Sequence, residues 1–401
     1  MSKPESLTTG LIDSWATDPT GPVALHMRQR LLAVEGEDGE DQVIYPPTYA
    51  DVGYNIDTLA DGTRVALIDS VGSQANRLEP AFKSESGHEL ANFVPQVDIV
   101  LRVEDCGKCD VCTKEKRKKA DKCENPWKEK RSLFELAHRA ADAVVQSSPS
   151  LLPTVEAAFA ELRKTGNAAA LATVAPTSLV FGCWDSRGGS GEKRPRLVRS
   201  IVRAWDVDEL HAAAQFNSVW KSLHEEDQQS LEEAAKKINK SKPNEPLSKK
   251  GLKDAPATTY KDGRRVLGGI VVRGVIERHV TINLVALRGI VGADEKESES
   301  LRKYLLSLSL LTATTDIDLF LREGCNLRIA DAADDWKVVP RRGEKTSVDL
   351  NSDAAQKELT KYAKAAAKPF LDAWKKLELG QDHDFDLKAA KALLGKSTDE
   401  E

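Results

Sequence analysis

Residues 64–83 read RVALIDSVGSQANRLEPAFK, and this stretch contains the transition from strand to helix that decides the fold. Its first six residues form a short apolar run, which is typical of a buried strand. Polar residues follow directly, among them Ser73, Gln74, Asn76 and Arg77, and they predict a helix over residues 70–83. The stretch therefore predicts a strand that leads straight into a helix.

The rest of the chain predicts strands and helices in mixed order. Strands are expected at residues 23–35, 97–103, 177–184, 197–207, 266–276, 280–287 and 319–329. Helices are expected from residue 132, at 154–163, 208–223, 230–239 and 298–311, and from residue 353 onward. Ser132 with Glu135 and Ser230 with Glu233 have the spacing of a capping box. Because the elements alternate without a regular βαβ rhythm, we expect an α+β fold with helical insertions.

The composition is that of a globular protein. The chain has 401 residues, of which 40% are hydrophobic and 30% are charged, so it can bury a substantial core. The N-terminus lacks the basic start and the apolar stretch of a secretory signal, and no apolar run is long enough to cross a membrane. We therefore expect a cytoplasmic protein that makes no membrane contact.

Charge is segregated along the chain, although the formal net charge is only −5. Residues 35–41 read EGEDGED and are acidic, whereas residues 114–131 contain nine basic and four acidic residues. Residues 187–203 contain six basic residues and one acidic residue. Local clusters of this kind decide where a polyanion binds. The alternative for each cluster is a solvated charged face without a ligand.

Four of the six cysteines, Cys106, Cys109, Cys112 and Cys123, lie in one loop with the spacing C-x2-C-x2-C-x10-C. Thiolates this close together in a reducing compartment bind a soft cation. Four sulfur ligands complete the shell of a structural zinc ion, and an iron–sulfur cluster is the competing interpretation. The hydrophilic segment between the third and fourth cysteines favours zinc. The metal would order a basic loop that presents Lys114, Lys116, Arg117, Lys118, Lys119 and Lys122.

A second basic segment covers residues 187–203 and begins within the loop WDSRGGSGEKRPR at residues 184–196. Arg194, Arg196 and Arg199 belong to it, and a guanidinium group is well suited to binding phosphate. A nucleotide-binding P-loop is excluded, because Glu192 separates the glycines from Lys193 and Pro195 follows. Trp184 could stack on a base, although a lone tryptophan is more often a core residue.

Four stretches of the sequence resemble a known family. They are VALIDSVGSQANRLEP at 65–80, FELAHRAADAVVQSS at 134–148, TSLVFGCWDSRGG…PRLVRSIVRAWDV at 177–207 and HVTINLVALRG at 279–289. Together they resemble the Cas-seven-type backbone subunit of type I-G CRISPR surveillance complexes, formerly called I-U, of the repeat-associated mysterious protein superfamily. The resemblance covers roughly residues 20–330.

The resemblance implies a modified ferredoxin-like, RRM-like palm with helical insertions and a thumb. It implies a non-enzymatic subunit that polymerises along the CRISPR guide RNA, contacts other subunits of the complex and supports recognition of target DNA. Ser73, Gln74, Asn76 and Arg77 match one family motif, and Trp184, Arg187, Arg196 and Arg199 match another, so these residues are expected to bind RNA. The alternatives are a metal-dependent ribonuclease of the same superfamily, with Asp69 and Asp185 as candidate ligands, and a zinc-stabilised DNA-binding or adaptor module.

These expectations give a domain plan. Residues 1–340 would form the palm, with a zinc-binding basic loop at 104–131 and a helical insertion at 208–263. Residues 341–401 would form a C-terminal helical segment. The basic residues from separate parts of the chain are expected to converge into one continuous track for the ribose-phosphate strand.

Overall fold

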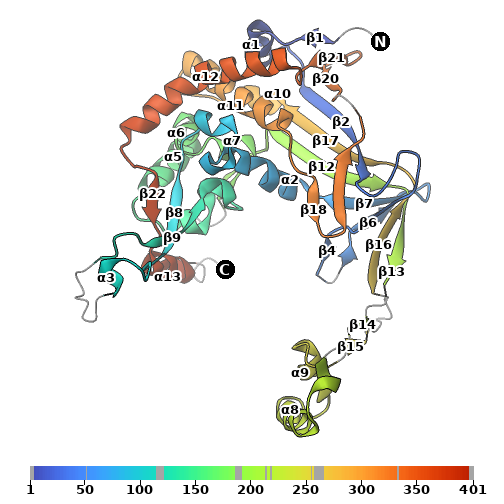
Figure 1. Ribbon diagram of the computed structural model, residues 1–401. Helices are drawn as coiled ribbons and strands as arrows, with labels where there is room; N and C mark the ends of the chain where they lie inside the picture. Colours follow the sequence, from blue (N-terminus) through green and yellow to red (C-terminus); the bar gives the residue numbers. More distant parts are fainter. Residues whose placement is uncertain are drawn as a thin grey trace.

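The computed structural model describes residues 4–50, 52–113, 122–185, 192–212, 215–216, 219–253, 255–256, 266–331 and 334–396. A long central sheet organises this part of the chain (Figure 1). Its strands, in spatial order, are β1 (Glu5–Ser6), β21 (Thr346–Asp349), β20 (Trp336–Val339), β2 (Ala24–Ala33), β17 (Ile276–Asn283), β12 (Val198–Trp205), β7 (Arg64–Asp69) and β6 (Ile56–Thr58). All neighbours except β1 and β21 are antiparallel. A hairpin of β18 (Phe320–Arg322) and β19 (Cys325–Ile329) joins the sheet where β19 pairs with β2.

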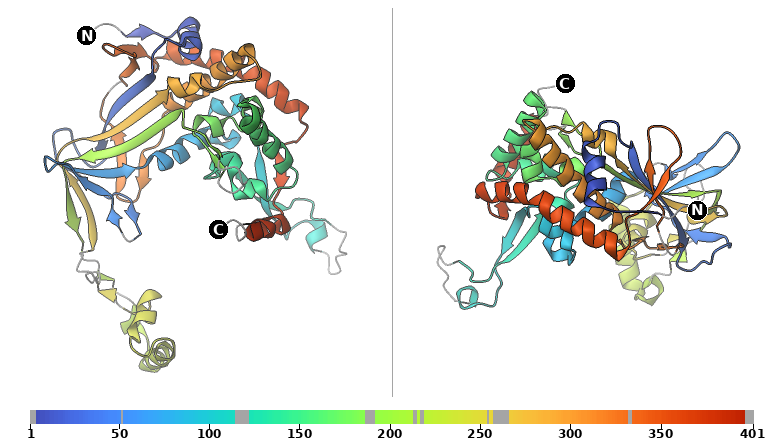
Figure 2. Two further views of the ribbon diagram at one scale, coloured as in Figure 1. Left: turned by 180° about the vertical axis from the view of Figure 1, so that it is seen from behind. Right: turned by 90° about the horizontal axis from the view of Figure 1, so that it is seen from above.

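The central sheet has one packed face and one open face. In β2, Leu25, Met27 and Leu31 are buried, whereas the alternate residues His26 and Arg28 are partly or fully exposed. This alternation is typical of an antiparallel sheet that packs on a core with one side only. The rear view shows the strands without covering helices (Figure 2, left). The sheet can therefore present polar side chains over several strands.

Helices cover the packed face. The principal ones are α11 (Glu295–Thr314) and α12 (Asp353–Lys376), which lie against each other, with α1 (Thr9–Thr17) across them. The smaller helices are α2 (Val71–Leu78), α4 (Ala143–Gln146), α5 (Leu152–Thr165), α6 (Ala169–Val174), α7 (Thr177–Val180) and α10 (Leu284–Arg288). Nearly every residue of α11 after Leu301 is buried, so this helix is the centre of the larger core. None of the described helices combines the length and the apolar character that crossing a bilayer requires.

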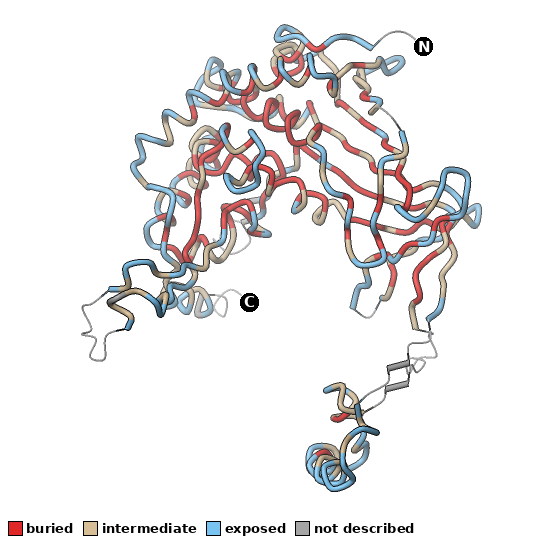
Figure 3. The backbone as a smooth tube through the Cα atoms, viewed as in Figure 1, coloured by how far each residue is buried: buried red, intermediate tan, exposed pale blue. Residues whose placement is uncertain are grey.

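Two projections extend from the body and give the molecule the outline of an arch (Figures 1 and 3). One is built on β8 (Asp98–Glu104), β9 (Trp127–Ser132) and β22 (Asp382–Asp384), and it carries α3 (Asp110–Thr113) and the cysteines. The other starts from a sheet of β13 (Val207–His211), β16 (Leu267–Val272) and β3 (Gln42–Ile44), and ends in α8 (Glu225–Ile238) and α9 (Asn244–Lys249). A smaller hydrophobic core lies where this second sheet meets the central one.

The remaining elements are short. The strand pairs are β4 (Thr48–Tyr49) with β5 (Gly53–Tyr54), β10 (Trp184–Asp185) with β11 (Glu192–Lys193), and β14 (Gln215–Phe216) with β15 (Ala255–Pro256). The 3-10 turns are η1 (Glu79–Phe82), η2 (Ser84–Ser86), η3 (Glu89–Phe93), η4 (Leu133–Glu135), η5 (Arg139–Ala141) and η6 (Val219–Ser222). The last helix is α13 (Leu387–Lys396).

The α+β prediction is confirmed, and so are its strongest elements. Strand β7 has the predicted bounds, and β2, β8, β12, α5 and α11 lie where the sequence placed them. The expected helix at 70–83 is α2 followed by the 3-10 turn η1, since Pro80 cannot donate to the helical ladder. The ferredoxin-like character of the palm and the domain plan stay predictions.

Two predicted elements in the middle of the chain are wrong. Residues 177–184 form the buried helix α7, a turn and β10 instead of a strand, because a short apolar run fits either kind of buried element. The helix predicted from residue 132 stops after one 3-10 turn, although its capping box is present. Arg139 has φ +55° and turns the chain before α4 begins.

The region after β12 also differs from the prediction. Residues 207–211 are strand β13 and not a helix, because they pair with β16. Helix α8 begins at Glu225, so Ser230 and Glu233 lie inside it and not at its start. The predicted strands at 266–276 and 280–287 belong to different sheets, and Asn283 ends the second by capping α10. The expected single strand at 319–329 is the hairpin β18–β19.

Candidate metal centre and nucleic-acid interface

The four loop cysteines lie together at the tip of the β8–β9 hairpin. Their Sγ atoms are all within 4.8 Å of one another, and the Cys109–Cys112 and Cys109–Cys123 Sγ distances are 3.4 and 3.8 Å. Sulfurs arranged tetrahedrally at about 2.3 Å from a zinc ion would be about 3.8 Å apart. The space between the sulfurs therefore suits one metal ion. The expected metal-binding cluster is confirmed as a geometry that could hold a metal ion.

The backbone around the cysteines favours thiolates. The amide of Cys109 donates to Cys106 Sγ at 3.3 Å, and the amide of Cys106 donates to Cys123 Sγ at 3.3 Å. Backbone N–H groups of Glu124 and Cys112 lower the pKa of Cys109 to about 6, while burial raises the pKa of Cys112 to about 12. Without a cation, the four sulfurs would thus not all be ionised at neutral pH. A bound cation would displace the remaining protons.

The base of the same hairpin is fixed to the body independently of the cysteines. Ile99 and Val100 of β8 are buried, and β22 near the C-terminus pairs with β8 in parallel. Asp382 of β22 accepts from Lys130 at 2.6 Å and from Lys128 at 3.3 Å. The cysteine cluster therefore lies at the tip of a hairpin whose root belongs to the core.

Helix α2, the first predicted RNA-binding element, is built around a buried carboxylate. Asp69 at the end of β7 is 1% exposed. It accepts hydrogen bonds from Ser73 Oγ at 2.7 Å, Gln74 Nε2 at 2.6 Å and Arg77 Nε at 3.0 Å. Gln74 is fully buried and also accepts from Ser200 Oγ at 2.7 Å. Ser73, Gln74 and Arg77 thus hold α2 on the sheet, and Gln74 offers no surface to a ligand.

Asn76 and Arg77 do reach a cleft. Asn76 is exposed, and Arg77 keeps 28% of its side chain exposed. Both line a cleft of about 710 Å³ whose opposite wall contains Phe320 of β18. Arg77 Nη2 donates to the carbonyl of Leu321 at 2.7 Å, which fixes the guanidinium at this wall. Of the four predicted RNA-binding residues of α2, Asn76 is therefore the one best placed to contact a nucleic-acid strand in the cleft.

A cluster of guanidinium groups lies just beyond α2. Glu79 is 1% exposed and forms a 2.6 Å ion pair with Arg139 Nε, while Arg139 Nη1 donates to the carbonyl of Gly182 at 3.1 Å. Arg196 also lies against Gly182, and burial together with the charge of Arg139 lowers the pKa of Arg196. Burial raises the pKa of Glu79 to about 7 against the lowering effect of Arg139. The Glu79 carboxylate thus pairs with Arg139, whereas Arg196 acts on it only as a nearby charge.

Two donors of this cluster have no acceptor. Arg139 Nη2 and Arg196 Nη1 are buried, and no hydrogen-bond partner for either exists in the described part of the chain. Arg139 also lies over the ring of Phe181, 5.3 Å from its centroid. Buried guanidinium N–H groups without acceptors are costly, and an anion would satisfy them. Arg139 was not predicted, since nothing in its sequence surroundings separates it from an ordinary helical arginine.

Gly182 brings the predicted basic segment against this cluster. It has φ +77°, and a Cβ at this position would lie 2.8 Å from the carbonyl oxygen of Arg194 and 3.0 Å from Cγ of Arg196. Glycine therefore permits the close approach of residues 194–196. Trp184, two residues further on, is 53% exposed and is not the core residue that a lone tryptophan usually is. The exposed ring of Trp184 thus lies within the same short segment of the chain as Arg194 and Arg196.

Arg199 lies on the other side of the central sheet. Ser200 faces α2 through its bond to Gln74, so the preceding residue points to the open face. The cysteine projection is also distant from α2, at one end of the arch (Figure 1). The described residues therefore do not form the single continuous track that the sequence suggested. Arg187 and the loop residues Lys116, Arg117, Lys118 and Lys119 lie outside the described residues.

The open face carries further polar residues that were not among the predicted site residues. His26 of β2 and His279 of β17 have ring centroids 5.4 Å apart, and Arg28 pairs with Glu277 beside them. Burial and the neighbouring His279 lower the pKa of His26. The alternation in LHMRQRL at 25–31 was the available signal, because it places His26, Arg28 and Arg30 on one side of a strand.

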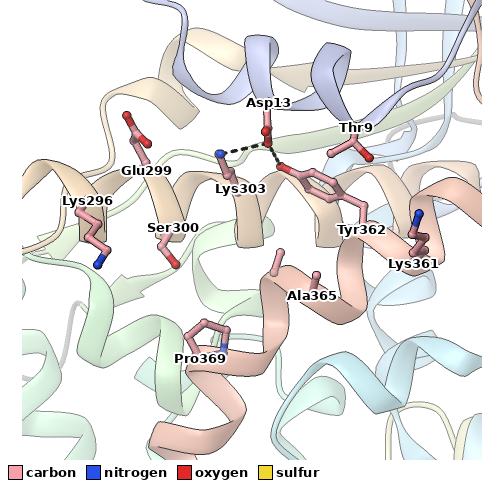
Figure 4. Close-up of a pocket in the computed structure, with 11 residues that line it drawn as sticks. Thr9, Asp13, Lys296, Glu299, Ser300, Lys303, Lys361, Tyr362, Ala365 and Pro369 are labelled. Carbon is pink, nitrogen blue, oxygen red and sulfur yellow. Dashed lines mark hydrogen bonds and ion pairs between the residues drawn. The ribbon is translucent and has the colours of Figure 1, made fainter.

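A separate cleft of about 600 Å³ lies between α1, α11 and α12 (Figure 4). The Tyr362 hydroxyl donates to Asp13 Oδ1 at 2.6 Å, and Lys303 Nζ lies 3.2 Å from the same oxygen. Ala365 and Pro369 form part of its wall. Because Asp13 is paired to both α11 and α12, these contacts attach α1 to the two long helices.

Comparison with known proteins gives one family. No curated protein matches the chain. Residues 25–209 match the model of the family described as CRISPR-associated protein GSU0053. The matched region contains the cysteine hairpin, α2 with Asp69, and the segment with Trp184 and Arg196. This match, over a little less than half of the chain, supports a CRISPR-associated protein.

Proposed function

We propose that this protein is an RNA-binding structural subunit of a CRISPR surveillance complex, with guide RNA held by the arginines beside Trp184. The family match supports a role in CRISPR defence. The observation that carries the RNA-binding role is the guanidinium cluster: Arg139 pairs with buried Glu79, Arg196 lies against Gly182 beside it, and each arginine has a buried donor without an acceptor among the described residues. A phosphate supplies acceptors of the right charge and geometry.

The chemistry around the cluster fits a single strand better than a duplex. Trp184 presents an exposed ring on which an unpaired base can stack, a contact worth about 1–3 kcal/mol that does not depend on base identity. The cleft with Asn76 and Arg77 is also lined by Pro80 and Ala81 of η1. Phosphate contacts and stacking without base readout are what a subunit that binds guides of any sequence requires.

The finer features of the resemblance belong to the same proposal. The palm would be the central sheet with its helices, in a ferredoxin-like arrangement, and the projection that ends in α8 and α9 would be the thumb. Further copies of the chain, other subunits of the complex and target DNA would be its partners. The cysteine cluster would hold zinc with a structural role, because four sulfurs leave no open position for chemistry.

A non-enzymatic role is part of the proposal. Asp69 was the first candidate ligand for a catalytic metal in the ribonuclease alternative. It is 1% exposed and already accepts from Ser73, Gln74 and Arg77, so its oxygens are engaged in packing α2. The geometry therefore does not favour a metal-dependent ribonuclease at this position.

The test is a binding titration with fluorescently labelled single-stranded RNA of several sequences. Changing Arg194→Ala and Arg196→Ala together should weaken binding to all sequences and make its salt dependence shallower, by about 0.7 in the log–log slope for each phosphate that is no longer neutralised. The double variant Lys375→Ala/Lys376→Ala removes the same charge at the exposed end of α12 and serves as the control. Equal affinities of the wild type and the arginine variant would contradict the proposed site.

A further inference from the structure

The open face of the central sheet carries a second cationic surface, separate from the Trp184 site. The strand register places side chains in rows that run across the strands. Lys337 of β20 is opposite His26 of β2, His26 is opposite Thr281 of β17, and Thr281 is opposite Arg199 of β12. In the adjacent row Arg28 is opposite His279. Because neighbouring strands are about 4.8 Å apart, the first row spans about 14 Å.

The cations of this surface differ in how far they are paired: Lys337 Nζ lies 2.9 Å from Asp335 Oδ1 and Arg28 pairs with Glu277, whereas the Arg199 and Arg203 side chains are unpaired among the described residues. Arg28 keeps 62% of its side chain exposed, and Arg199 is exposed. The side chains of Arg199 and Arg203 have no hydrogen-bond or ion-pair partner among the residues that the structure describes. Glu277 lies in the next row, between Arg30 and Arg203; its side chain is 5% exposed and is paired with Arg28 and His279. The four cations Arg28, Arg199, Arg203 and Lys337 outnumber Glu277 and Asp335, the two acids paired with them, so this group of residues is net positive in a protein whose total charge is negative.

The centre of the face combines flat rings with polar hydrogen-bonding groups. The rings of His26 and His279 are tilted by 31° to each other, and His26 Nδ1 lies 3.2 Å from Thr281 Oγ1. Glu277 Oε2 lies 3.0 Å from His279 Nε2 and orients that ring. Histidine rings can stack on unpaired bases, and hydroxyl and imidazole groups can hydrogen-bond a ribose 2′-hydroxyl. The cations at the two ends of the row, Lys337 and Arg199, are about 14 Å apart, which is farther than neighbouring phosphates of one strand, so they would contact phosphates that are not adjacent.

We propose that this face binds single-stranded RNA, as a second contact surface on the opposite side of the sheet from α2. Charge complementarity selects a polyanion, the imidazoles require unpaired bases, and the central hydroxyl and imidazole groups favour ribose over deoxyribose. The acidic segment at residues 35–41 of a second copy fits less well. Asp38 and Glu37 already pair within the chain with Arg30 and Arg328. The inference rests on the proposed RNA-binding function.

The test uses the full-length protein and labelled oligouridine, with oligodeoxythymidine of equal length as the comparison. Arg199→Ala/Arg203→Ala should weaken RNA binding and lower the log–log salt slope by about 1.4, as expected when two phosphates are no longer neutralised. Neither side chain has a partner among the described residues that the change would leave unpaired, so the fold should persist, which circular dichroism checks. The charge-conserving pair Arg199→Lys/Arg203→Lys should restore most of the salt slope.

Photo-crosslinking of RNA that contains 4-thiouridine locates the contact. Crosslinks in peptides that contain β2 and β17 are expected, and they should persist in the Arg194→Ala/Arg196→Ala variant. Crosslinks confined to residues 71–82 and 182–196, with unchanged affinity of the Arg199/Arg203 variant, would overturn the inference and leave the proposed function standing. DNA affinity equal to RNA affinity would also overturn it. A wild type that binds no RNA would remove the proposed function itself.

Discussion

Replacing Asp69 by alanine tests whether the SQANR segment of α2 serves the fold before it serves RNA. The substitution removes a carboxylate that is 1% exposed and that fixes three side chains of the following helix. Arg322 also approaches it, with Nη2 3.5 Å from Oδ1. After the change, Gln74 would keep its bond from Ser200, but its buried amide N–H group would lack an acceptor. We therefore expect the Asp69→Ala protein to be folded but clearly less stable.

The size of the effect follows from these contacts. Breaking a buried, hydrogen-bonded charge network by removing one partner costs about 3–5 kcal/mol. The two arginines retain 28% and 25% exposure of their side chains, so water would compensate them in part, and the lower end of that range, about 3 kcal/mol, is expected. With an unfolding entropy of about 2.1 cal/mol/K per residue, this corresponds to a fall in melting temperature of about 4 °C for a chain that unfolds in one transition.

Thermal unfolding followed by circular dichroism measures this difference. Asp57→Ala is the matched control, because Asp57 is exposed on β6 in the same sheet and should change the melting temperature by less than about 1 °C. An Asp69→Ala protein as stable as the control would refute the claim that Asp69 organises α2. Ser73 and Arg77 would then be free to bind RNA, as the sequence predicted.

Three further predictions concern the metal cluster and the arginine cluster. Elemental analysis should find one metal ion per chain, and Cys109→Ser should abolish metal binding. The same substitution should raise hydrogen exchange at the hairpin tip but not in β8 near Ile99. Loss of exchange protection throughout the core would contradict a peripheral metal. Gly182→Ala should lower the free energy of unfolding by roughly 1–3 kcal/mol. Gly87→Ala is the control and should lower it less, because Gly87 has a similar φ of +76° but open space around it. Equal losses of stability would show that the close approach of Arg194 to Gly182 is unimportant. Burial raises the pKa of Glu79 to about 7 from 4.5. The stability that the protonated Glu79 contributes is therefore complete below about pH 4.5 and is lost as the pH rises to about 7. Glu79→Gln should flatten the pH dependence of the melting temperature in this interval, and an unchanged profile would argue against a raised pKa.

The sequence predicted those features that depend on neighbouring residues. The strand at 64–69, the capping box at Ser132 and the four-cysteine cluster were all readable, because periodicity, caps and ligand spacing are local. The helix expected after Ser132 failed for a tertiary reason. Arg139 adopts a positive φ and pairs with Glu79, which is 60 residues away in the chain, and this contact ends the local pattern.

The candidate site was predictable in its composition but not in its arrangement. Residue types marked Arg196 and Arg199 alike, yet Arg196 is beside Glu79 and Arg139 whereas Arg199 faces the open side of the sheet. Arg196 precedes β12, whereas Arg199 lies within it, and the pairing of β12 with β7 and β17 fixes the side of the sheet that Arg199 faces. Similarly, the polar character of Gln74 suggested a ligand contact, and its complete burial became visible only with Asp69 and Ser200 in place.

The most direct test of the RNA-binding role is the nucleic acid that accompanies the protein when it is purified from cells that also carry its CRISPR locus. Sequencing should recover single-stranded RNA derived from the repeat–spacer array, with spacers of every sequence represented. The Arg194→Ala/Arg196→Ala protein, purified in parallel, should retain much less of it. Protein that emerges free of RNA, or that carries cellular RNA without enrichment for the array, would contradict the role proposed for this chain.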